Sequence, residues 1–150
     1  MDTSFAVATA TDIELLLQLM REYYAFDHLP FDEQLARTAL EKIFVDSSLG
    51  GVWMIQYERD TVGYLAITLG YSLEYGGRDA FIDEIYIREN YRGRGIGQRA
   101  LAFAEDTCRS FGVRALHLEV EHANATAYNV YRKGGFIDHE RYLMTKRLHS

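Results

Sequence analysis

The segment that most constrains the fold of this chain is residues 91–97, which read Tyr-Arg-Gly-Arg-Gly-Ile-Gly. It follows an apolar run at 81–87 that predicts a strand, and it opens a helical pattern of apolar residues over 96–111. Such a turn points several backbone N–H groups at one spot, where the helix N-terminus adds partial positive charge. We therefore expect an anion site suited to phosphate or pyrophosphate, with bidentate contacts from Arg92 and Arg94. The alternative is a solvated basic loop whose glycines only turn the chain.

The charge of this 150-residue chain is distributed unevenly. The net charge is −6, from 16 basic and 22 acidic side chains, yet the segment 88–99 holds four Arg and one Glu and carries +3. An acidic protein is a poor nonspecific ligand of nucleic acid, so we expect no such partner. No apolar run approaches the ~20 residues of a membrane span, and the N-terminus lacks a signal peptide's basic start, so we expect no membrane partner. The single cysteine, Cys108, favours a reducing, cytoplasmic location.

Turn signals and hydrophobic periodicity divide the chain into alternating elements. The expected strands are 5–9, 52–57, 62–73, 81–87, 115–120 and 142–148, and the expected helices are 12–25, 31–45, 96–111 and 124–133. Thr11 and Glu14 have the spacing of a capping box at the start of the first helix, and Gly112 stands where a left-handed helix stop is expected. Strands that pair first by hairpins and then alternate with helices predict a mixed α/β sheet in a single domain, residues 1–150.

We compared the segment 91–97 and its surroundings with two known phosphate-binding motifs. A P-loop would need GxxxxGK[ST], which is absent, but 95–100 fits the dinucleotide pattern G-x-G-x-x-[GA], with Glu119 near the position of a ribose-binding acid. Against this fit, seven polar or glycine residues separate Ile87 from the first glycine, and the motif begins past the middle of the chain. Only one strand–helix–strand unit follows the motif. A nucleotide-dependent oxidoreductase is therefore the runner-up among the enzyme classes.

Two motifs in this order resemble those of the GCN5-related N-acetyltransferases, and the resemblance in element order extends over essentially the whole chain. Residues 92–97 match the family's [QR]-x-x-G-x-[GA] loop, which holds the pyrophosphate of acetyl-CoA. Residues 124–136 are similar to its N-x-x-A-x-x-(L/V)-Y-x-x-x-G-F segment. The resemblance implies about seven strands and about four helices, with the sheet splayed in a V between the fourth and fifth strands where acetyl-CoA enters.

The resemblance also implies roles for individual residues. Tyr131 matches the thiolate-facing tyrosine that protonates the sulfur of CoA, although it can equally fill a helix face. Asn124 caps its helix or bonds the cofactor's amide, and Tyr128 lines the cofactor channel or only packs. The cofactor-binding residues expected on these grounds are Ile85, Tyr86, Ile87, Arg92, Gly93, Arg94, Gly95, Ile96, Gly97, Asn124, Tyr128 and Tyr131.

Asp83 and Glu84 are the only charges in the apolar strand 81–87. A carboxylate there is costly to bury without a partner, so at least one of the two is a candidate catalytic base. Strand alternation predicts that Glu84 shares a face with Ile82 and Tyr86, and Asp83 with Phe81, Ile85 and Ile87. At most one of them should then face the acceptor. Either Asp83 or Glu84 is the base, or both only bind a cationic acceptor, and we favour Glu84 as the base. The alternative for the other is a salt bridge to Arg78 or Arg88.

The acceptor region is expected at residues 22–33, where four aromatic side chains accompany four carboxylates. This composition suits an organic cation, although an ordinary amphipathic helix pair with solvated acids would look the same. The candidate substrate-binding residues are Tyr23, Tyr24, Asp27, Glu119 and Glu121. His117, Glu119 and His122 lie close in sequence, but no further ligand cluster supports a metal, and we expect none.

The segment 81–97 looks especially like the polyamine (diamine) branch of the family, which has a paired-acid strand before the same loop. The predicted function is therefore acetyl transfer from acetyl-CoA, by direct attack, to a primary amine of a small cationic, polyamine-like acceptor. A homodimer is common among similar proteins. The alternative outside the oxidoreductase class is a non-catalytic acyl-CoA-binding module.

Overall fold

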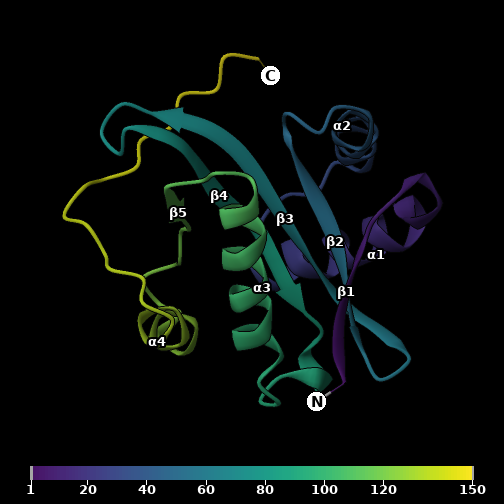
Figure 1. Ribbon diagram of the computed structural model, residues 1–150. Coiled ribbons are helices and arrows are strands. Elements are labelled where there is room, and N and C mark those ends of the chain that lie inside the picture. Colours follow the sequence, from purple (N-terminus) through teal and green to yellow (C-terminus); the bar gives the residue numbers. More distant parts are fainter. Residues whose placement is uncertain (1, 150) are drawn as a thin grey trace.

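The computed structural model describes residues 2–149, which form one mixed sheet with helices on both faces (Figure 1). In chain order the elements are β1 (Thr3–Val7), the 3₁₀ helix η1 (Ala10–Asp12), α1 (Ile13–Phe26), α2 (Glu33–Val45), β2 (Gly50–Tyr57), β3 (Asp60–Ser72), β4 (Gly77–Ile87), η2 (Glu89–Tyr91), α3 (Ile96–Ser110), β5 (Ala115–His117) and α4 (Ala125–Lys133). The expected mixed α/β architecture is confirmed, and Gly112 ends α3 with the expected positive φ of 76°.

The sheet has the order β1-β2-β3-β4-β5, in which β1 to β4 are antiparallel and β5 runs parallel to β4. The β4–β5 ladder joins only residues 79–81 to residues 115–117. Beyond this ladder the two strands separate, while β4 continues for six more residues to Ile87. The expected splay between the fourth and fifth strands is therefore confirmed.

Two apolar layers hold the sheet, one on each face. On one face α3 contributes a buried stripe at helical spacing, namely Ile96, Ala100, Leu101, Ala104 and Cys108. On the other face α1 and α2 pack onto β2, β3 and β4 through Leu16, Leu19, Met20, Leu40, Val52, Met54, Tyr64 and Tyr86. Figure 1 shows α3 in front of the sheet and α1 and α2 behind it. The β4 strand thus contributes side chains to both cores.

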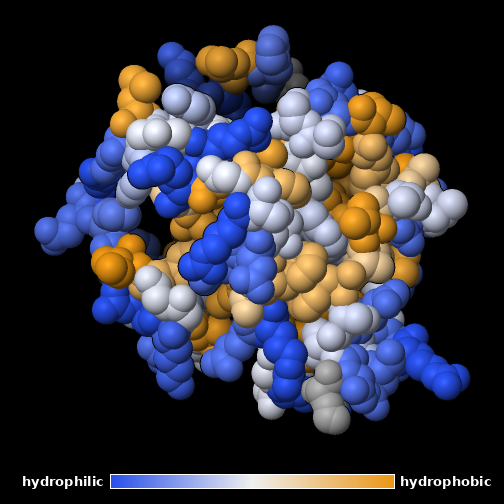
Figure 2. Space-filling view, in the orientation of Figure 1, coloured by the Kyte–Doolittle hydropathy of each residue, from blue (hydrophilic) through white to orange (hydrophobic). Residues whose placement is uncertain are grey.

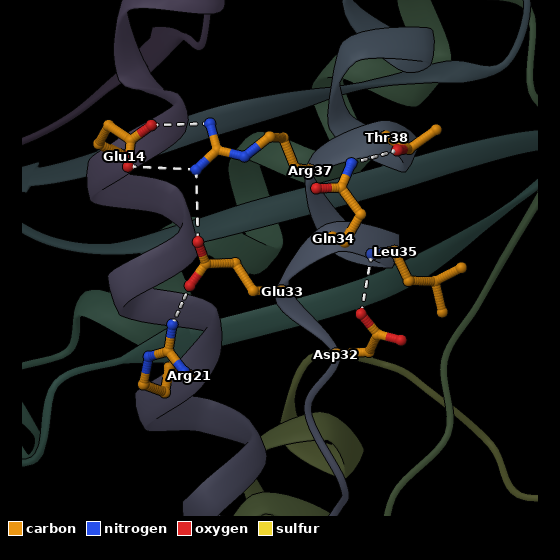
Figure 3. Close-up of polar contacts among 8 residues, drawn as sticks. All are labelled: Glu14, Arg21, Asp32, Glu33, Gln34, Leu35, Arg37 and Thr38. Atoms are coloured by element: carbon orange, nitrogen blue, oxygen red, sulfur yellow. Dashed lines mark hydrogen bonds and ion pairs between the residues drawn. The ribbon is translucent and has the colours of Figure 1, made fainter.

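The capping box expected at Thr11 and Glu14 is wrong. A 3₁₀ turn precedes α1, so the start of the helical segment lies earlier, and the backbone N–H of Thr9 donates to the Asp12 carboxylate at 2.9 Å. Glu14 instead accepts a hydrogen bond at 2.7 Å from Arg37 of α2, within a polar network that joins the two helices (Figure 3).

The strand expected at 142–148 is also wrong, because the described residues contain no strand after β5, and the sheet has five strands rather than about seven. Since β5 is three residues long, its outer edge offers few ladder hydrogen bonds to a further strand. The segment after α4 is tied to the β3–β4 turn by an ion pair of 3.0 Å between Arg141 and Glu74. The side chains of Tyr142 and Met144 remain exposed.

Candidate active site

A β-bulge in β4 sets the orientation of the two strand carboxylates. Ala66 of β3 pairs with Glu84, whereas the next residue, Ile67, pairs with Ile82. Asp83 is therefore the extra residue that a bulge inserts into one strand of an antiparallel pair. A bulge shifts the alternation of side chains by one position at this point.

The shift places both carboxylates on the α1 face. Ile82 packs in the core under α3, so its neighbour Asp83 points to the opposite face. Glu84 points to that same face, because its partners are Tyr24 of α1 and Tyr64 of the α1-side core. The expectation that Asp83 and Glu84 lie on opposite faces, with Glu84 beside Ile82, is therefore wrong.

Two phenols hold the Glu84 carboxylate. The Tyr24 hydroxyl donates to Oε2, and the Tyr64 hydroxyl donates to Oε1 at 2.7 Å. Burial raises the pKa of Glu84 and the negative charge of Asp83 raises it further, while the two phenol hydrogen bonds act in the opposite direction. Desolvation by the surrounding protein also raises the pKa of Asp83, although its side chain is still open to solvent. Among the described residues, neither carboxylate forms an ion pair.

Arg88, one of the salt-bridge partners considered for the strand acids, binds Glu22 of α1 instead. Its Nε and Nη2 atoms donate to the two carboxylate oxygens of Glu22 at 3.1 and 3.0 Å. The Tyr86 hydroxyl donates to the same carboxylate at 3.1 Å. Glu22 is thus neutralised by a bidentate pair, unlike the two carboxylates of β4.

Tyr131 of α4 packs against the α3-side core, where its ring lies beside that of Phe136. Burial raises the pKa of Tyr131, and the negative charge of Asp27 adds to the rise. The pKa of Tyr23 is raised by burial first, then by the charges of Asp27 and Glu84 and by Tyr131. Contacts join four of the residues expected from the sequence: the Tyr24 hydroxyl donates to Glu84, the rings of Tyr23 and Tyr24 lie 5.6 Å apart between centroids, and Asp83 is the chain neighbour of Glu84. Tyr131 packs against the α3-side core, and the effect of the Asp27 charge on its pKa is what relates it to the end of α1.

The loop before α3 has the geometry of an anion site. Gly93 and Gly95 have φ values of 78° and 80°, which side-chain-bearing residues rarely adopt. The first N–H groups of α3, from Ile96 onward, have no intrahelical acceptor and point out of the helix end. A Cβ atom built on Gly93 would meet no atom within 4 Å, so the space in front of the loop is open. Ile96 is buried and contributes only its backbone.

The two loop arginines lie against aromatic rings. The Arg92 Nε atom donates to the carbonyl of Ile87 at 2.8 Å, and its guanidinium lies 4.5 Å from the ring centroid of Phe26. The Arg94 guanidinium lies 5.5 Å from the ring centroid of Tyr91. Arg92 therefore links the end of β4 to the last residue of α1.

Residues 13–136 match the family model for the acetyltransferase (GNAT) family. The chain belongs to the GNAT acetyltransferases. YycN of Bacillus subtilis (strain 168), described as an uncharacterized N-acetyltransferase, is 34% identical over 128 residues, which cover 80% of this chain and 78% of that protein. A thialysine N-epsilon-acetyltransferase of Mus musculus is 25% identical over 148 residues, which cover 91% of this chain and 85% of that protein.

Solved structures share the fold. An integron cassette protein from the mobile metagenome of Cole Harbour Salt Marsh has a TM-score of 0.86 at 33% identity, over 97% of this chain and 91% of that chain. A predicted acetyltransferase from Clostridium acetobutylicum, solved with acetyl-CoA, has a TM-score of 0.80 at 17% identity, over 98% of this chain and 99% of that chain. The second likeness is one of fold alone.

Other residues expected in the site of this GNAT protein have partners elsewhere. The Asn124 side chain accepts a hydrogen bond from the Ala127 N–H at 3.1 Å, so it caps α4. The Tyr128 hydroxyl donates to Asp138 at 3.2 Å. Glu119 and Glu121 are exposed beyond β5. Within the described range, no hydrogen bond or ion pair ties either glutamate to the cluster around Glu84.

The histidine segment holds no metal-binding cluster in the part of the chain that the structure describes. His117 lies 3.1 Å, through Nε2, from the Asp79 carboxylate, and its ring lies against Phe81 and Tyr75. None of the described helices is long and apolar enough to cross a membrane.

A hollow lies beside β5, between α3, α4 and the C-terminal segment, with a volume of about 690 Å³. Figure 2 shows the recess with apolar residues at its wall. Leu116, Leu118, Tyr131 and Phe136 line it, so one side of Tyr131 is reached from this direction.

Sequence reasoning missed Tyr64. Tyr64 lies in an otherwise apolar stretch of β3, where a tyrosine looks like core packing. The register would have revealed it, because Tyr64 pairs with Tyr86 and is therefore a diagonal neighbour of Glu84 on the same face. That register depends on the bulge, which hydrophobic periodicity does not show.

Proposed function

We propose that this GNAT protein transfers an acetyl group from acetyl-CoA to a primary amine of a small cationic acceptor. The observation that carries the proposal is the pairing of Asp83 and Glu84, two carboxylates on one face of β4, with the tyrosines Tyr24 and Tyr64 on Glu84. Negative charge without a guanidinium partner, next to aromatic rings, suits an organic ammonium.

Acetyl-CoA, when bound, supplies the acetyl thioester that the amine attacks. The residues that would hold it are the loop 92–97, through its backbone N–H groups and the α3 dipole, and the edge of β4 at Ile85, Tyr86 and Ile87. The fit is supported by the open space at Gly93 and by the separation of β4 from β5 beyond residue 81. The local +3 charge of 88–99 favours a polyanion there. In this proposal Arg94 and Arg92 turn toward phosphate, while Asn124 and Tyr128 line the cofactor channel from α4.

Glu84 is the proposed base, with Asp83 as the second carboxylate that binds the acceptor's charge. An amine arrives as an ammonium and must lose a proton before its nitrogen can attack. A carboxylate whose pKa is raised toward neutrality accepts that proton more effectively than an ordinary surface glutamate. The proton moves to an oxygen of Glu84 before the C–N bond forms, and Glu84 later releases it to solvent. The nitrogen loses a second proton in becoming an amide nitrogen, and this proton balances the one that the departing sulfur takes up.

Tyr131 is the proposed acid. As the C–S bond breaks, the Tyr131 hydroxyl donates its proton to the departing sulfur. Burial and the charge of Asp27 raise the pKa of this phenol, so it remains protonated at neutral pH until the thiolate forms. The ring's half-buried position against Phe136, at 6.2 Å between centroids, limits its motion.

The acceptor class is part of the proposal. Tyr23, Tyr24 and Asp27 form the wall opposite β4, and Glu119 and Glu121 extend an acidic rim beyond β5. A polyamine-like acceptor is supported by this arrangement and by the match, over 91% of this chain, to a protein named for acetylating thialysine, an amine. The proposal also includes a single N-acetyltransferase domain over residues 1–150, a cytoplasmic location supported by the single, buried cysteine, and a homodimer supported by the family resemblance.

The experiment is a screen of purified protein against a library of mono-, di- and polyamines with acetyl-CoA, using release of free thiol as the readout. We expect turnover with small cationic amines and little with neutral amines. Calorimetry with acetyl-CoA and with NAD(P) accompanies the screen. Binding of NAD(P) without binding of acetyl-CoA would favour the oxidoreductase alternative, and binding of acetyl-CoA without turnover of any amine would favour the non-catalytic module.

A further inference from the structure

We propose that Tyr64 and Tyr24 are positioning residues that hold the Glu84 carboxylate in one orientation and keep it available for proton transfer. This inference rests on the proposed function. It adds one residue of β3 and one of α1 to the proposed site, whose base lies on β4, whose cofactor loop is 92–97 and whose acid lies on α4.

Two hydrogen bonds fix the orientation of the Glu84 carboxylate. Each oxygen of Glu84 accepts one phenol hydroxyl, Oε1 from Tyr64 at 2.7 Å and Oε2 from Tyr24. The Tyr64 side chain is 1% exposed, and its ring packs against those of Tyr23 and Tyr86 at centroid distances of 6.5 and 6.4 Å. A ring enclosed in this way has one place for its hydroxyl, so the hydroxyl fixes the carboxylate.

The two phenol hydrogen bonds leave hydrogen-bond acceptor sites of the Glu84 carboxylate free. An ionised carboxylate has about four lone-pair sites, and two phenols occupy two of them. The remaining sites can accept N–H groups from an ammonium that enters beside Asp83. A guanidinium partner would have neutralised Glu84, as Arg88 neutralises Glu22, whereas a phenol orients the carboxylate and leaves its charge for the acceptor.

The groups that face Glu84 determine how its pKa changes when one of the phenol hydroxyls is removed. Tyr24 and Tyr23 face it from α1, Tyr64 from β3 and Asp83 from its own strand. Burial and Asp83 favour the protonated carboxyl, and the two donating phenols favour the carboxylate. Removing either hydroxyl should therefore raise the pKa of Glu84 without altering its distance from the acceptor along the strand.

The test compares Tyr64→Phe and Tyr24→Phe with Tyr71→Phe, a control at an exposed tyrosine of the same strand β3. The first readout needs no substrate: glutamate side chains are labelled with ¹³C, and Glu84 is assigned by its loss in Glu84→Gln and titrated by NMR. We expect each of the two substitutions to raise the pKa of Glu84 by about one pH unit, the size expected of one hydrogen bond to a charged group, and Tyr71→Phe to leave it unchanged.

The second readout is the pH profile of kcat/KM for the best amine found in the screen. Its acid limb should move to higher pH by the same amount as the NMR titration, with KM for acetyl-CoA unchanged. A structural role for the phenols alone would lower activity at all pH values and leave the limb in place. If Tyr64→Phe does not fold, Tyr24→Phe, at a half-buried site, decides the question.

The two proposals fail in different ways. A Glu84 pKa that is unchanged or lowered in the tyrosine variants overturns the positioning role, whether or not the protein turns over amines. A protein that acetylates no amine overturns the proposed function, and the NMR titration then still reports whether the two phenols control Glu84. A shifted NMR titration with an unshifted acid limb removes Glu84 as the base and, with it, the positioning role in catalysis.

Discussion

Two groups of acids in this protein have opposite surroundings. Between α1 and α2, Glu14 and Glu33 each meet a guanidinium: Arg37 lies 2.7 Å from Glu14 and 3.4 Å from Glu33, and Arg21 also bonds Glu33 (Figure 3). These acids are open to solvent, and the Glu14 side chain is 80% exposed. On β4, Glu84 is part-buried and meets only phenol hydroxyls among the described residues, with a second carboxylate beside it.

The difference separates acids that are candidates for function from acids that only stabilise the packing of two helices. A solvated, neutralised acid places little demand on its surroundings and contributes modestly to helix packing. A buried acid without a cation disfavours its own charged form, and such groups concentrate at functional sites. The β4 carboxylates therefore belong to the chemistry of this N-acetyltransferase in our proposal, and the α1–α2 network belongs to its scaffold.

The largest expected effect is on the proposed base. Glu84→Gln should lower kcat/KM for the amine by roughly 10²–10⁴-fold, the usual contribution of a general base, and leave acetyl-CoA binding intact. Glu33→Gln, which also removes one negative charge, should change kcat/KM by less than about twofold. Steady-state kinetics and calorimetry measure both. Equal effects of the two substitutions would abolish the distinction between the two groups of acids.

A smaller loss is expected at the proposed acid. Tyr131→Phe should lower kcat by roughly 10²-fold, because the sulfur then departs without a proton donor, while KM for acetyl-CoA stays within a few-fold. Tyr142→Phe, at an exposed tyrosine of the C-terminal segment, is the control. A Tyr131→Phe variant as fast as the wild type with every amine would remove the acid assignment.

The two groups also differ in how stability depends on pH. The folded-state pKa of Glu84 is raised, so its contribution to stability is fully present below the unfolded pKa of about 4.5 and is lost as pH rises through the folded pKa. Relative to Glu84→Gln, the wild type should therefore become less stable as the pH rises from about 4.5 toward neutrality. Urea unfolding at several pH values measures the difference. A wild type that gains stability relative to Glu84→Gln over this range contradicts the burial argument.

The smallest expected effect lies in the α1–α2 network. Arg37→Ala should lower the thermal midpoint by about 2 °C or less in low salt, and the loss should fade in 1 M salt as the ion pairs are screened. Arg59→Ala, in the exposed β2–β3 turn, provides the comparison. A large and salt-independent loss at Arg37 would show that the network does more than join two helices.

The parts of the fold that could be predicted are those with a local signal. Gly93 and Gly95 mark a turn that requires positive φ, and Gly112 ends α3. The apolar spacing of α3 predicts a helix whichever strands the helix packs against. These features predicted the glycine turn before α3 and the order of elements, whereas the splay was expected from the family resemblance. Tyr131 and Asp27, more than 100 residues apart, were predicted separately from motif and composition, and in the fold the negative charge of Asp27 raises the pKa of Tyr131.

The parts that could not be predicted depend on pairing between strands. The extra residue at Asp83 leaves no trace in a pattern of seven mostly apolar residues, so the faces of β4 were assigned wrongly on one side of it. Tyr64 acquires its role only through that register. The strand expected at 142–148 failed for a related reason, because its formation depends on an edge that β5 barely provides.

The bulge has a consequence for insertions and deletions. It absorbs one residue, so a chain lacking Asp83 would still direct Ile82 to the α3 side and Glu84 to the α1 side, but on a strand without the local bend. The β4–β5 ladder ends at Phe81, two positions before that bend. Loss of this single residue would therefore leave both cores intact and remove one of the two carboxylates from the α1 face. In this protein one inserted residue, rather than any change of a core side chain, places two carboxylates next to each other on the α1 face of β4.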